Sequence, residues 1–448
     1  MRVTFVGHSS LIIWLGSSGI LCDPWLSGRV FNNGWGLSPE PVFDPAYLKD
    51  INHLWISHEH ADHLHFATLK NFPQEFKSRV VVIFQKNNSD KVSASLRKIG
   101  YQNFLTVPHC KRVPVGSSGD WIAVYQHLHM DSALVVGAAS GETVINVNDA
   151  ELNEHDCKKL RARFGPFAAT FRQFSIAGFD GILENSRARR RSILQTMLNQ
   201  HRWLGADVTC PIASFMYFCR PDNEHLNALA NTALDALKEC QKHALACHLL
   251  FPGTTRDLLD LSRSAGDVAK FREFYANPQR SIDPLDPIVP ISDIATKFSL
   301  RTSDWRKKFP AVLINRMGTI PIRIEDLGAT YAFNFRNGSI CETDQEPIMA
   351  INSQPLLFAF AMPFGIQTLG VSGRYRLKNL TTPWKFVRIV SSLYNSEIYL
   401  KPRYLLNRRF LAWLGKRLPD IIPTIRQQAI RFFPRQPSPA SLESKAAE

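Results

Sequence analysis

The first part of the chain alternates short apolar runs, typical of buried strands, with amphipathic stretches at helical spacing. Strands are predicted at 3–13, 19–22, 80–84, 120–125, 132–136, 142–148 and 170–174, and helices at 91–99, 151–163, 189–204 and 224–243. Strands that alternate with helices along the chain are typical of an α/β domain. The pattern therefore predicts a layered α/β fold over this region.

The pattern changes after residue 277, where a proline-dotted stretch to 290 indicates a linker. We expect a first domain at 1–280 and an accessory α+β region at 290–433, in which 354–360 reads as a strand. Residues 363–375 contain glycines that suit a hairpin, or a close approach of the backbone to a ligand. The final segment, 434–448, is rich in Pro, Ser, Ala and Glu and is predicted to be disordered.

Composition favours a folded, reduced protein. The chain has 448 residues, 45% of them hydrophobic, and a mean hydropathy of -0.14. It contains no apolar run of 18 residues, so no transmembrane helix is expected. The N-terminus enters a strand directly, without a signal-peptide pattern. Eight cysteines occur without a C-x-x-C pair, which disfavours a disulfide or zinc-ribbon framework and favours a cytoplasmic location.

The charge balance is strongly basic, with 53 Lys and Arg against 39 Asp and Glu, a net charge of +14. Such an excess favours anionic partners, and much of it lies in 187–191 and 378–435. Within 403–435, apolar residues repeat at helical spacing, which indicates a helix packed on its own domain. Peripheral contact with an acidic membrane is the alternative for this basic C-terminal region. No zinc-finger, basic-zipper or RNA-binding pattern occurs, so a nucleic-acid partner is not expected.

The most informative segment for chemistry is 58–63, which has the sequence His-Glu-His-Ala-Asp-His and follows the apolar run 54–57. Metal sites need neutral imidazoles and oxygen donors held close to the ion. A turn after a strand end can direct His58 and His60 at one ion and Asp62 and His63 at a second. The alternative is a surface loop that is rich in histidine by chance.

The H-x-H-x-D-H pattern resembles the signature of the metallo-β-lactamase superfamily. The N-terminal Gly-His-Ser-Ser at 7–10 and Asp-Pro-Trp at 23–25 are most similar to one branch of it. That branch includes ascorbate-6-phosphate lactonase, N-acyl-phosphatidylethanolamine phospholipase D and the metallo-β-lactamase half of CMP-N-acetylneuraminate hydroxylase. The resemblance implies a four-layer αββα fold with an additional C-terminal region. It also implies that Asp23 supports the metal-binding turn, although a simple turn residue is the alternative.

The resemblance implies further ligands on loops at the same edge of the sheet. His129 is expected to complete the histidine set of the first ion, with His127 as the alternative. Asp149 ends a predicted strand, where the superfamily places a carboxylate that bridges both ions. An N-cap aspartate is the structural alternative for Asp149.

The last expected ligand, a histidine for the second ion, is where the chain departs from the family pattern. Arg220 stands near that place, and its guanidinium cannot ligate a metal. His225 is the substitute candidate; if it does not bind, Arg220 is expected to face an anionic substrate. His8 is expected to lie behind the ligands, to face the substrate, or to be purely structural.

Two enzyme classes follow from these expectations. In the first, two divalent ions, zinc by preference with manganese or iron as alternatives, activate a water against a small anionic ester, lactone, amide or phosphodiester. Asp62 or Asp149 would orient or deprotonate that water.

In the second class, the same ligands hold two irons of an oxygenase acting on an N-acyl or nucleotide sugar. The resembling hydroxylases also carry a Rieske cluster on C-x-H and C-x-x-H pairs. This chain has no C-x-H, and its C-x-x-H, 240–243, lies in a predicted helix. An oxygenase would thus need a separate electron donor. A degenerate binding module is the third alternative.

Overall fold

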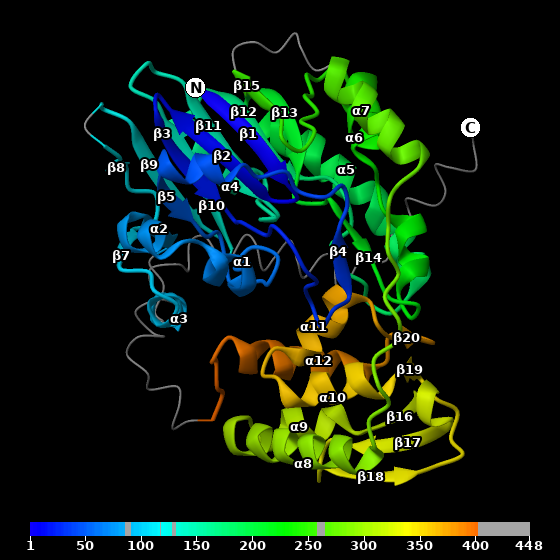
Figure 1. Cartoon of the computed structure of the whole chain (residues 1–448). Helices are drawn as coiled ribbons and strands as arrows, with labels where there is room; N and C mark the ends of the chain where they lie inside the picture. The colour runs from blue at the N-terminus through cyan, green and yellow to red at the C-terminus, as the bar shows by residue number, and fades with distance from the viewer. Residues whose placement is uncertain (86–90, 117, 128–130, 258–264, 402–448) are drawn as a thin grey trace, which may run out of the picture.

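Two mixed β-sheets face each other in a computed structural model that describes residues 1–85, 91–116, 118–127, 131–257 and 265–401 (Figure 1). The first sheet has the order β15 (Thr255–Asp257), β1 (Arg2–Gly7), β2 (Ser10–Leu15), β3 (Ser18–Cys22), β5 (Ile51–Trp55), β6 (Val81–Gln85) and β7 (Asn103–Val107). The second has the order β13 (Ala206–Ile212), β12 (Phe167–Gln173), β11 (Thr143–Asn148), β10 (Ser132–Gly137), β9 (Trp121–Gln126) and β8 (Val113–Pro114).

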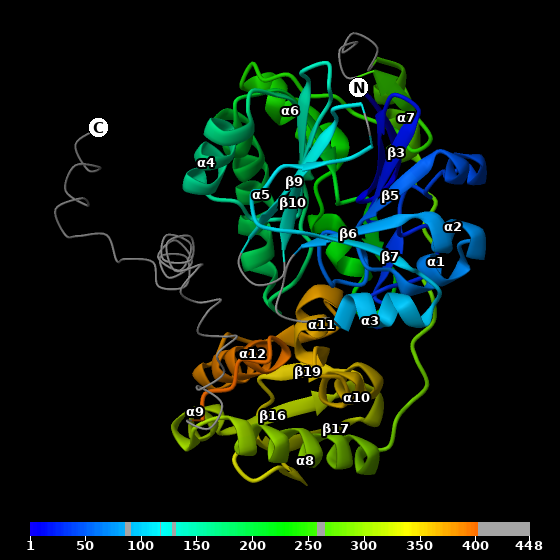
Figure 2. The same ribbon diagram turned by 90° about the vertical axis from the view of Figure 1, so that its left-hand side faces the viewer.

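Helices cover both outer faces of this sandwich (Figure 2). On the first sheet lie α1 (Phe66–Asn71), α2 (Gln74–Arg79) and α3 (Lys91–Lys98), and on the second lie α4 (Glu154–Phe164) and α5 (Leu183–Leu204). The helices α6 (Ala233–Lys242) and α7 (Ala265–Ala276) follow in the chain and pack against each other. Alternate residues of each strand enter the core between the sheets, and the others pack under the helices. The predicted four-layer αββα fold is confirmed.

The strand directions bring several strand ends to one edge of the sandwich. Strand β3 is parallel to β5, and β11 is parallel to β12. The segments that follow β3, β5 and β11 therefore leave their sheets at the same edge, which is where ligands bind in sheets of this kind. Among the described helices, none is both long and apolar enough to cross a membrane.

Residues 277–290 contain no helix or strand, and a second α/β region begins at α8 (Ile291–Lys308). Its sheet has the order β18 (Ser339–Glu342), β17 (Ala329–Asn334), β16 (Thr319–Ile324), β19 (Met349–Ile351) and β20 (Arg376–Leu377). Its other helices are α9 (Ala311–Met317), α10 (Ser353–Ala361), α11 (Gly365–Ser372) and α12 (Thr382–Asn395). The expected basic helix within 403–435 and the disordered tail 434–448 lie outside the described residues.

Two local predictions in this second region were wrong. The expected strand at 354–360 is the helix α10, whose buried Leu356, Ala359 and Phe360 share one face at helical spacing. The expected hairpin at 363–375 contains the helix α11, which ends at Gly373 with φ 69°. Short apolar runs do not distinguish a strand from a buried helix, and packing against the second sheet decided the outcome.

The predicted helix at 224–243 is interrupted. A 3-10 turn covers Glu224–Leu229, and α6 begins only after Thr232. The Thr232 side chain accepts from the backbone N–H of Asp235, and the Asp235 side chain accepts from the backbone N–H of Thr232. This capping box starts a new helix where the Ala- and Leu-rich composition alone predicted a continuous one.

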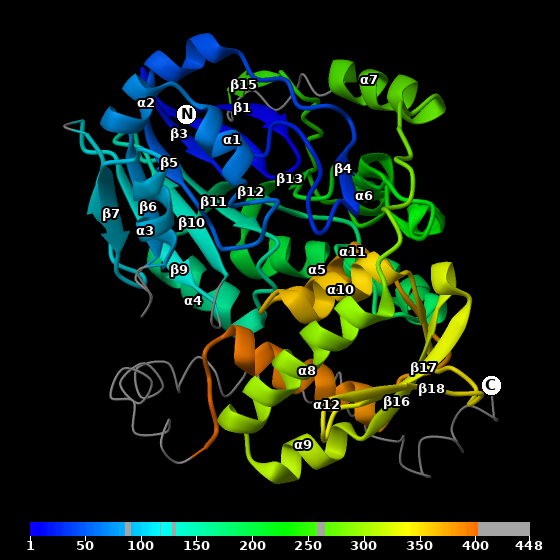
Figure 3. The ribbon, with the colours of Figure 1, turned by 60° about the horizontal axis from the view of Figure 1, so that its bottom comes forward.

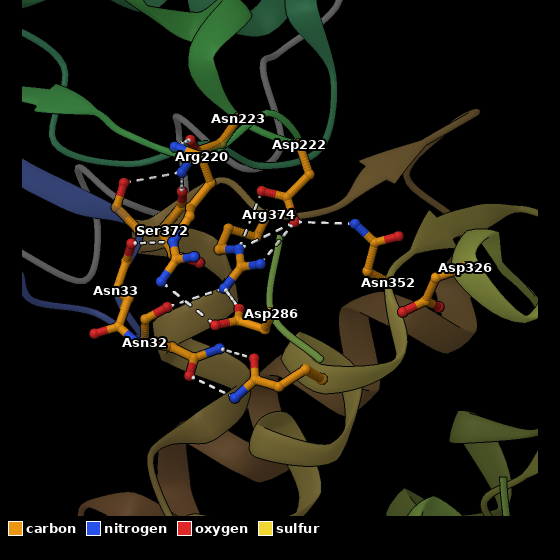
Figure 4. Close-up of polar contacts among 12 residues, drawn as sticks. Asn32, Asn33, Arg220, Asp222, Asn223, Asp286, Asp326, Asn352, Ser372 and Arg374 are labelled. Atoms are coloured by element: carbon orange, nitrogen blue, oxygen red, sulfur yellow. Dashed lines mark hydrogen bonds and ion pairs between the residues drawn. The ribbon is translucent and has the colours of Figure 1, made fainter. Parts of the chain in front are cut away.

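A buried ionic network joins the second region to the sandwich (Figure 4). Arg374, which lies between α11 and β20, is 1% exposed. Its guanidinium contacts the carboxylate of Asp222 at 2.9 Å and that of Asp286 at 2.6 Å, and it donates to the carbonyl oxygen of Asn32 at 3.0 Å. Asp222 and Asn32 belong to the sandwich, and Asp286 to the connection at 277–290. One side chain therefore ties three segments together.

Apolar packing continues the same junction, where α11 lies beside the sandwich (Figure 3). The strands β4 (Trp35–Leu37) and β14 (Met216–Phe218) pair beside it, and Trp35 and Phe218 share a core cluster with Phe298 and Trp305 of α8. The indole N–H of Trp35 donates to the carbonyl of Val371 in α11 at 3.0 Å. Because the members of this cluster are buried side chains from both parts, their packing holds the second region against the sandwich.

Replacing Arg374 should therefore destabilise the protein strongly. An Arg374→Gln variant leaves the buried carboxylates of Asp222 and Asp286 without their cation, a change that typically costs about 3–5 kcal/mol. The matched control is Arg376→Gln, since Arg376 pairs with Glu325 at the exposed surface and such pairs contribute about 0–1 kcal/mol. Urea unfolding followed by tryptophan fluorescence measures both. Equal losses in the two variants would contradict the proposed importance of the network.

Candidate metal centre

The predicted metal-binding loop lies at the edge of the sandwich where the ends of β3, β5 and β11 meet. Residues 56–65 follow β5 directly. On the far side, the ring of His60 lies 6.1 Å from that of Phe31, and Ala61 packs against the apolar cluster shared with the second region. The loop thus contacts both the sandwich and the apolar cluster shared with the second region.

Three side chains form what we call the first donor group: His58, His60 and Asp149, with one potential ligand atom of each within 4.8 Å of the others. The Nε2 of His58 lies 2.7 Å from the Nδ1 of His60. The Nδ1 of His58 faces the hydroxyl of Ser57 at 2.9 Å, which fixes the ring and leaves Nε2 directed at the group.

A second donor group contains His8, Asp62 and His63, again with ligand atoms within 4.8 Å of one another. The Oδ2 of Asp62 lies 3.1 Å from the Nε2 of His8 and 3.3 Å from the Nε2 of His63. All three side chains are buried. The pairing of Asp62 with His63 follows the sequence prediction, whereas the inclusion of His8 in the group does not.

Asp149 lies between the two groups. Its Oδ2 is 3.5 Å from the Nε2 of His58 and 3.6 Å from the Nε2 of His63. The helix α4 is capped by Asn153, so the N-cap alternative for Asp149 is ruled out. A carboxylate oxygen placed between two imidazoles of different groups has the position that a bridging ligand needs.

Asp23 holds the loop from inside the sandwich. One carboxylate oxygen accepts from the backbone N–H of Ser57, and the other from its hydroxyl, each at 2.7 Å. The second oxygen also lies 3.0 Å from the Nδ1 of His63, and it accepts from the amide of Asn148 at the end of β11. Because Nδ1 of His63 is held by a carboxylate, its Nε2 is directed at the donor groups.

The carboxylates give the site an electrostatic preference for positive charge. Burial alone would lower the pKa of His63, but Asp62, Asp149 and Asp23 hold that pKa well above its usual value. Burial would raise the pKa of Asp62, but His63 and His8 hold it well below its usual value. Burial is the main cause that lowers the pKa of His58, and the neighbouring His63 and His60 lower it further. The carboxylates that stabilise a proton on His63 would equally stabilise a metal cation, which replaces that proton when it binds.

Strained backbone conformations and an unpartnered carboxylate oxygen both occur at this site. Four non-glycine residues around the site, His8, Asp23, Asn148 and Ala213, have φ between 41° and 58°. Each costs about 1–2 kcal/mol in this left-handed conformation, and strain of this kind collects at functional sites. The Oδ1 of Asp62 is buried without a hydrogen-bond partner among the described residues, which is costly unless a cation is bound.

The loop after β9 carries the expected third histidine of the first ion. His129 lies outside the described residues. The Nδ1 of His127, the alternative, lies 3.3 Å from Asp156 of α4, and its Nε2 has no partner among the described residues. Asp131 was not among the residues predicted from the sequence. Burial, and after it the negative charge of Asp149, raises the pKa of Asp131 to about 6, which places Asp131 near the site. Its position two residues after His129 was the available signal.

Arg220 and His225 lie at the junction with the second region, outside both donor groups. Arg220 donates to the carbonyl of Asn33 at 3.0 Å and pairs with Asp286 at 3.4 Å. The ring of His225 lies 6.4 Å from that of Phe179. The structure therefore brings together His8, His58, His60, Asp62, His63 and Asp149, with Asp23 behind them, and places Arg220 and His225 elsewhere.

Comparison with known proteins identifies the class that this fold and site define. Residues 2–121 match the model of the Beta-lactamase superfamily domain. This N-terminal part of the chain matches a metallo-β-lactamase superfamily domain, as its sequence resemblance implied.

The curated relatives extend the match. The chain is 28% identical over 245 residues to a "Putative Rieske 2Fe-2S iron-sulfur protein" of Mycobacterium tuberculosis, covering 51% of this chain and 46% of that protein. It is 24% identical over 241 residues to the cytidine monophosphate-N-acetylneuraminic acid hydroxylase of Mus musculus, covering 50% and 41%. The chain thus matches about half the length of these relatives.

Solved structures of similar fold include both hydrolases and a hydroxylase. CmlA, a diiron beta-hydroxylase from Streptomyces venezuelae, is 16% identical with a TM-score of 0.40, covering 57% of this chain and 53% of that one. A possible metal-dependent hydrolase from Veillonella parvula is 13% identical with a TM-score of 0.44, covering 57% and 98%.

Removing the carboxylate of Asp23 should weaken metal binding. The Asp23→Asn variant replaces the carboxylate beside the Nδ1 of His63 with a neutral amide. Substitutions of residues that support metal ligands typically weaken metal affinity by about 10–100-fold. Competition with a chromophoric chelator measures the affinity. The control is Asp44→Asn, an exposed residue that caps the 3-10 turn Pro45–Lys49 far from the centre. Unchanged affinity in Asp23→Asn would show that Asp23 serves the backbone of the loop alone.

Proposed function

We propose that this protein is a hydrolase that uses two divalent metal ions, zinc by preference, to cleave a small anionic ester, lactone, amide or phosphodiester. The observation that carries the proposal is the position of Asp149, with one oxygen 3.5 Å from His58 and 3.6 Å from His63. A carboxylate shared between two donor groups supports a pair of ions close enough to act on one reacting centre.

The ions would lower the pKa of a bound water and stabilise the negative charge that develops on the substrate. The residues of the chain supply the remaining functions. Asp149 has a side chain 21% exposed, so it is the carboxylate within the donor groups that best reaches substrate and water together. Asp62 is buried and its pKa is held well below its usual value, which suits it to orient a water as a charged acceptor and makes it a weak base.

The charge of the chain supports an anionic substrate. Around the centre, Ala61 packs against the apolar cluster shared with the second region, and the ring of Phe31 lies 6.1 Å from that of His60. Partial burial of this kind strengthens electrostatic interactions in the site. The net charge of +14 favours the approach of anions in solution.

A second candidate, an oxygenase with two irons, is supported by a specific observation. Each donor group offers two histidines and one carboxylate, the ligand set of many non-haem iron enzymes. The hydroxylase relatives point in the same direction, to an N-acyl or nucleotide sugar. An oxygenase would take its electrons from a separate donor, since the sequence lacks a C-x-H pair for a Rieske cluster.

Metal identity and oxygen dependence separate the two reactions. For protein produced with both zinc and iron available, we expect two zinc ions per chain by elemental analysis. We also expect hydrolysis of a substrate from a panel of phosphodiesters, lactones and amides in the absence of oxygen. Two irons per chain, together with oxygen consumption in the presence of a reductant and a sugar substrate, would instead establish the oxygenase.

The first donor group should be required for metal binding in either case. A His58→Ala, His60→Ala double variant loses both imidazoles of that group, and we expect it to lose at least one metal ion per chain. His155→Ala, on the exposed side of α4, is the control. Circular dichroism checks that both variants fold. Retention of two ions in the folded double variant would overturn the assignment of the centre.

A further inference from the structure

An ion at the second donor group needs a third protein ligand besides Asp62 and His63. The family pattern expects a late histidine, but Arg220 stands near that place and is engaged with Asn33 and Asp286. His225 lies beside Phe179, outside both donor groups. Among the described residues, the donor that completes a set with Asp62 and His63 is His8.

His8 reaches the group from the turn between β1 and β2. Its φ of 48° is unusual for a residue with a side chain, and its carbonyl accepts from the backbone N–H of Ala213 at 2.7 Å. This turn directs the ring into the site, where Trp25 contacts it edge-on with ring centroids 5.2 Å apart. The side chain is 1% exposed, so its direction is fixed by packing and not by solvent.

The ligand atoms of this group converge on one place. The Nε2 of His8 and the Nε2 of His63 lie on the same carboxylate oxygen of Asp62, at 3.1 Å and 3.3 Å. The other oxygen of Asp62 is buried and has no hydrogen-bond partner among the described residues. A buried carboxylate oxygen without a partner, beside two imidazoles, indicates a missing cationic occupant.

We propose that His8 is a protein ligand of the second metal ion and takes the place of the late histidine that this chain lacks there. The inference rests on the proposed function, in that it requires a centre for two ions. It assigns to the ion a ligand set of His8, Asp62 and His63, with Asp149 shared with the first ion. The N-terminal strand turn, and not a C-terminal loop, completes the centre.

The competing explanation is that His8 only donates a hydrogen bond to Asp62. The variant His8→Gln separates the two, because the glutamine amide retains a donor for Asp62 but is a poor metal ligand. His155→Gln on the surface of α4 is the matched control. Cobalt(II) is the probe, since its spectrum and its effect on proton resonances report directly on bound histidines.

With wild-type protein and the control, we expect two cobalt ions per chain after dialysis. His8→Gln should retain one, bind the second at least tenfold more weakly, and lose one paramagnetically shifted imidazole N–H resonance when both sites are filled at high cobalt concentration. Circular dichroism confirms that the variant is folded.

Two results would overturn the inference, and they differ in what else they affect. If His8→Gln binds two cobalt ions with unchanged affinity and an unchanged number of imidazole resonances, His8 is not a ligand and the proposed hydrolase stands. If the wild-type protein binds no cobalt or zinc, the proposed function fails together with the ligand assignment. Two bound ions without hydrolytic turnover would contradict the hydrolase alone and leave the role of His8 intact.

Discussion

The buried carboxylate of Asp23 is the interaction on which the site depends. It accepts from the backbone and hydroxyl of Ser57 and from Asn148, and it lies against the Nδ1 of His63. Asp23 itself follows β3, and its partners follow β5 or end β11, so one side chain joins both sheets at the edge where the ligands meet. A buried carboxylate is stable only when its acceptor positions are filled. The same hydrogen bonds that satisfy Asp23 therefore fix the direction of the metal-binding loop.

The second α/β region has a structural role that determines the surroundings of the centre. Arg374 links the sandwich to this region through Asp222 and Asp286, and Arg220 joins the same network. The apolar cluster around Trp35 and Phe298 continues the contact and includes Ala61 of the metal-binding loop. The surroundings of the loop on that side are therefore set by packing and by buried ion pairs.

The centre has the donor groups of a metal site, and those groups do not select one reaction. Carboxylates that favour positive charge, strained backbone at four positions and two convergent donor groups all point to bound cations. Hydrolysis and oxygen activation both use such a centre, and they differ in the ions and in the supply of electrons. The relatives that match half of this chain include hydroxylases, which makes the identity of the metal the decisive property of this protein.

The sequence by itself determined a layered α/β fold and the core of the site, because both depend on local patterns. Strand and helix periodicity predicted the layered fold, and the resemblance of the 58–63 motif to the superfamily implied its four layers. The spacing within 58–63 placed three imidazoles and an aspartate on one turn. Tertiary structure alone decided the rest. His8 and Asp62 are 54 residues apart, and Asp23 and Asn148 are 125 apart, so their contacts depend on how strands pair and not on neighbouring residues. The helices α10 and α11 were predicted as strand and hairpin for the same reason: a short apolar run takes the conformation that its packing partners require.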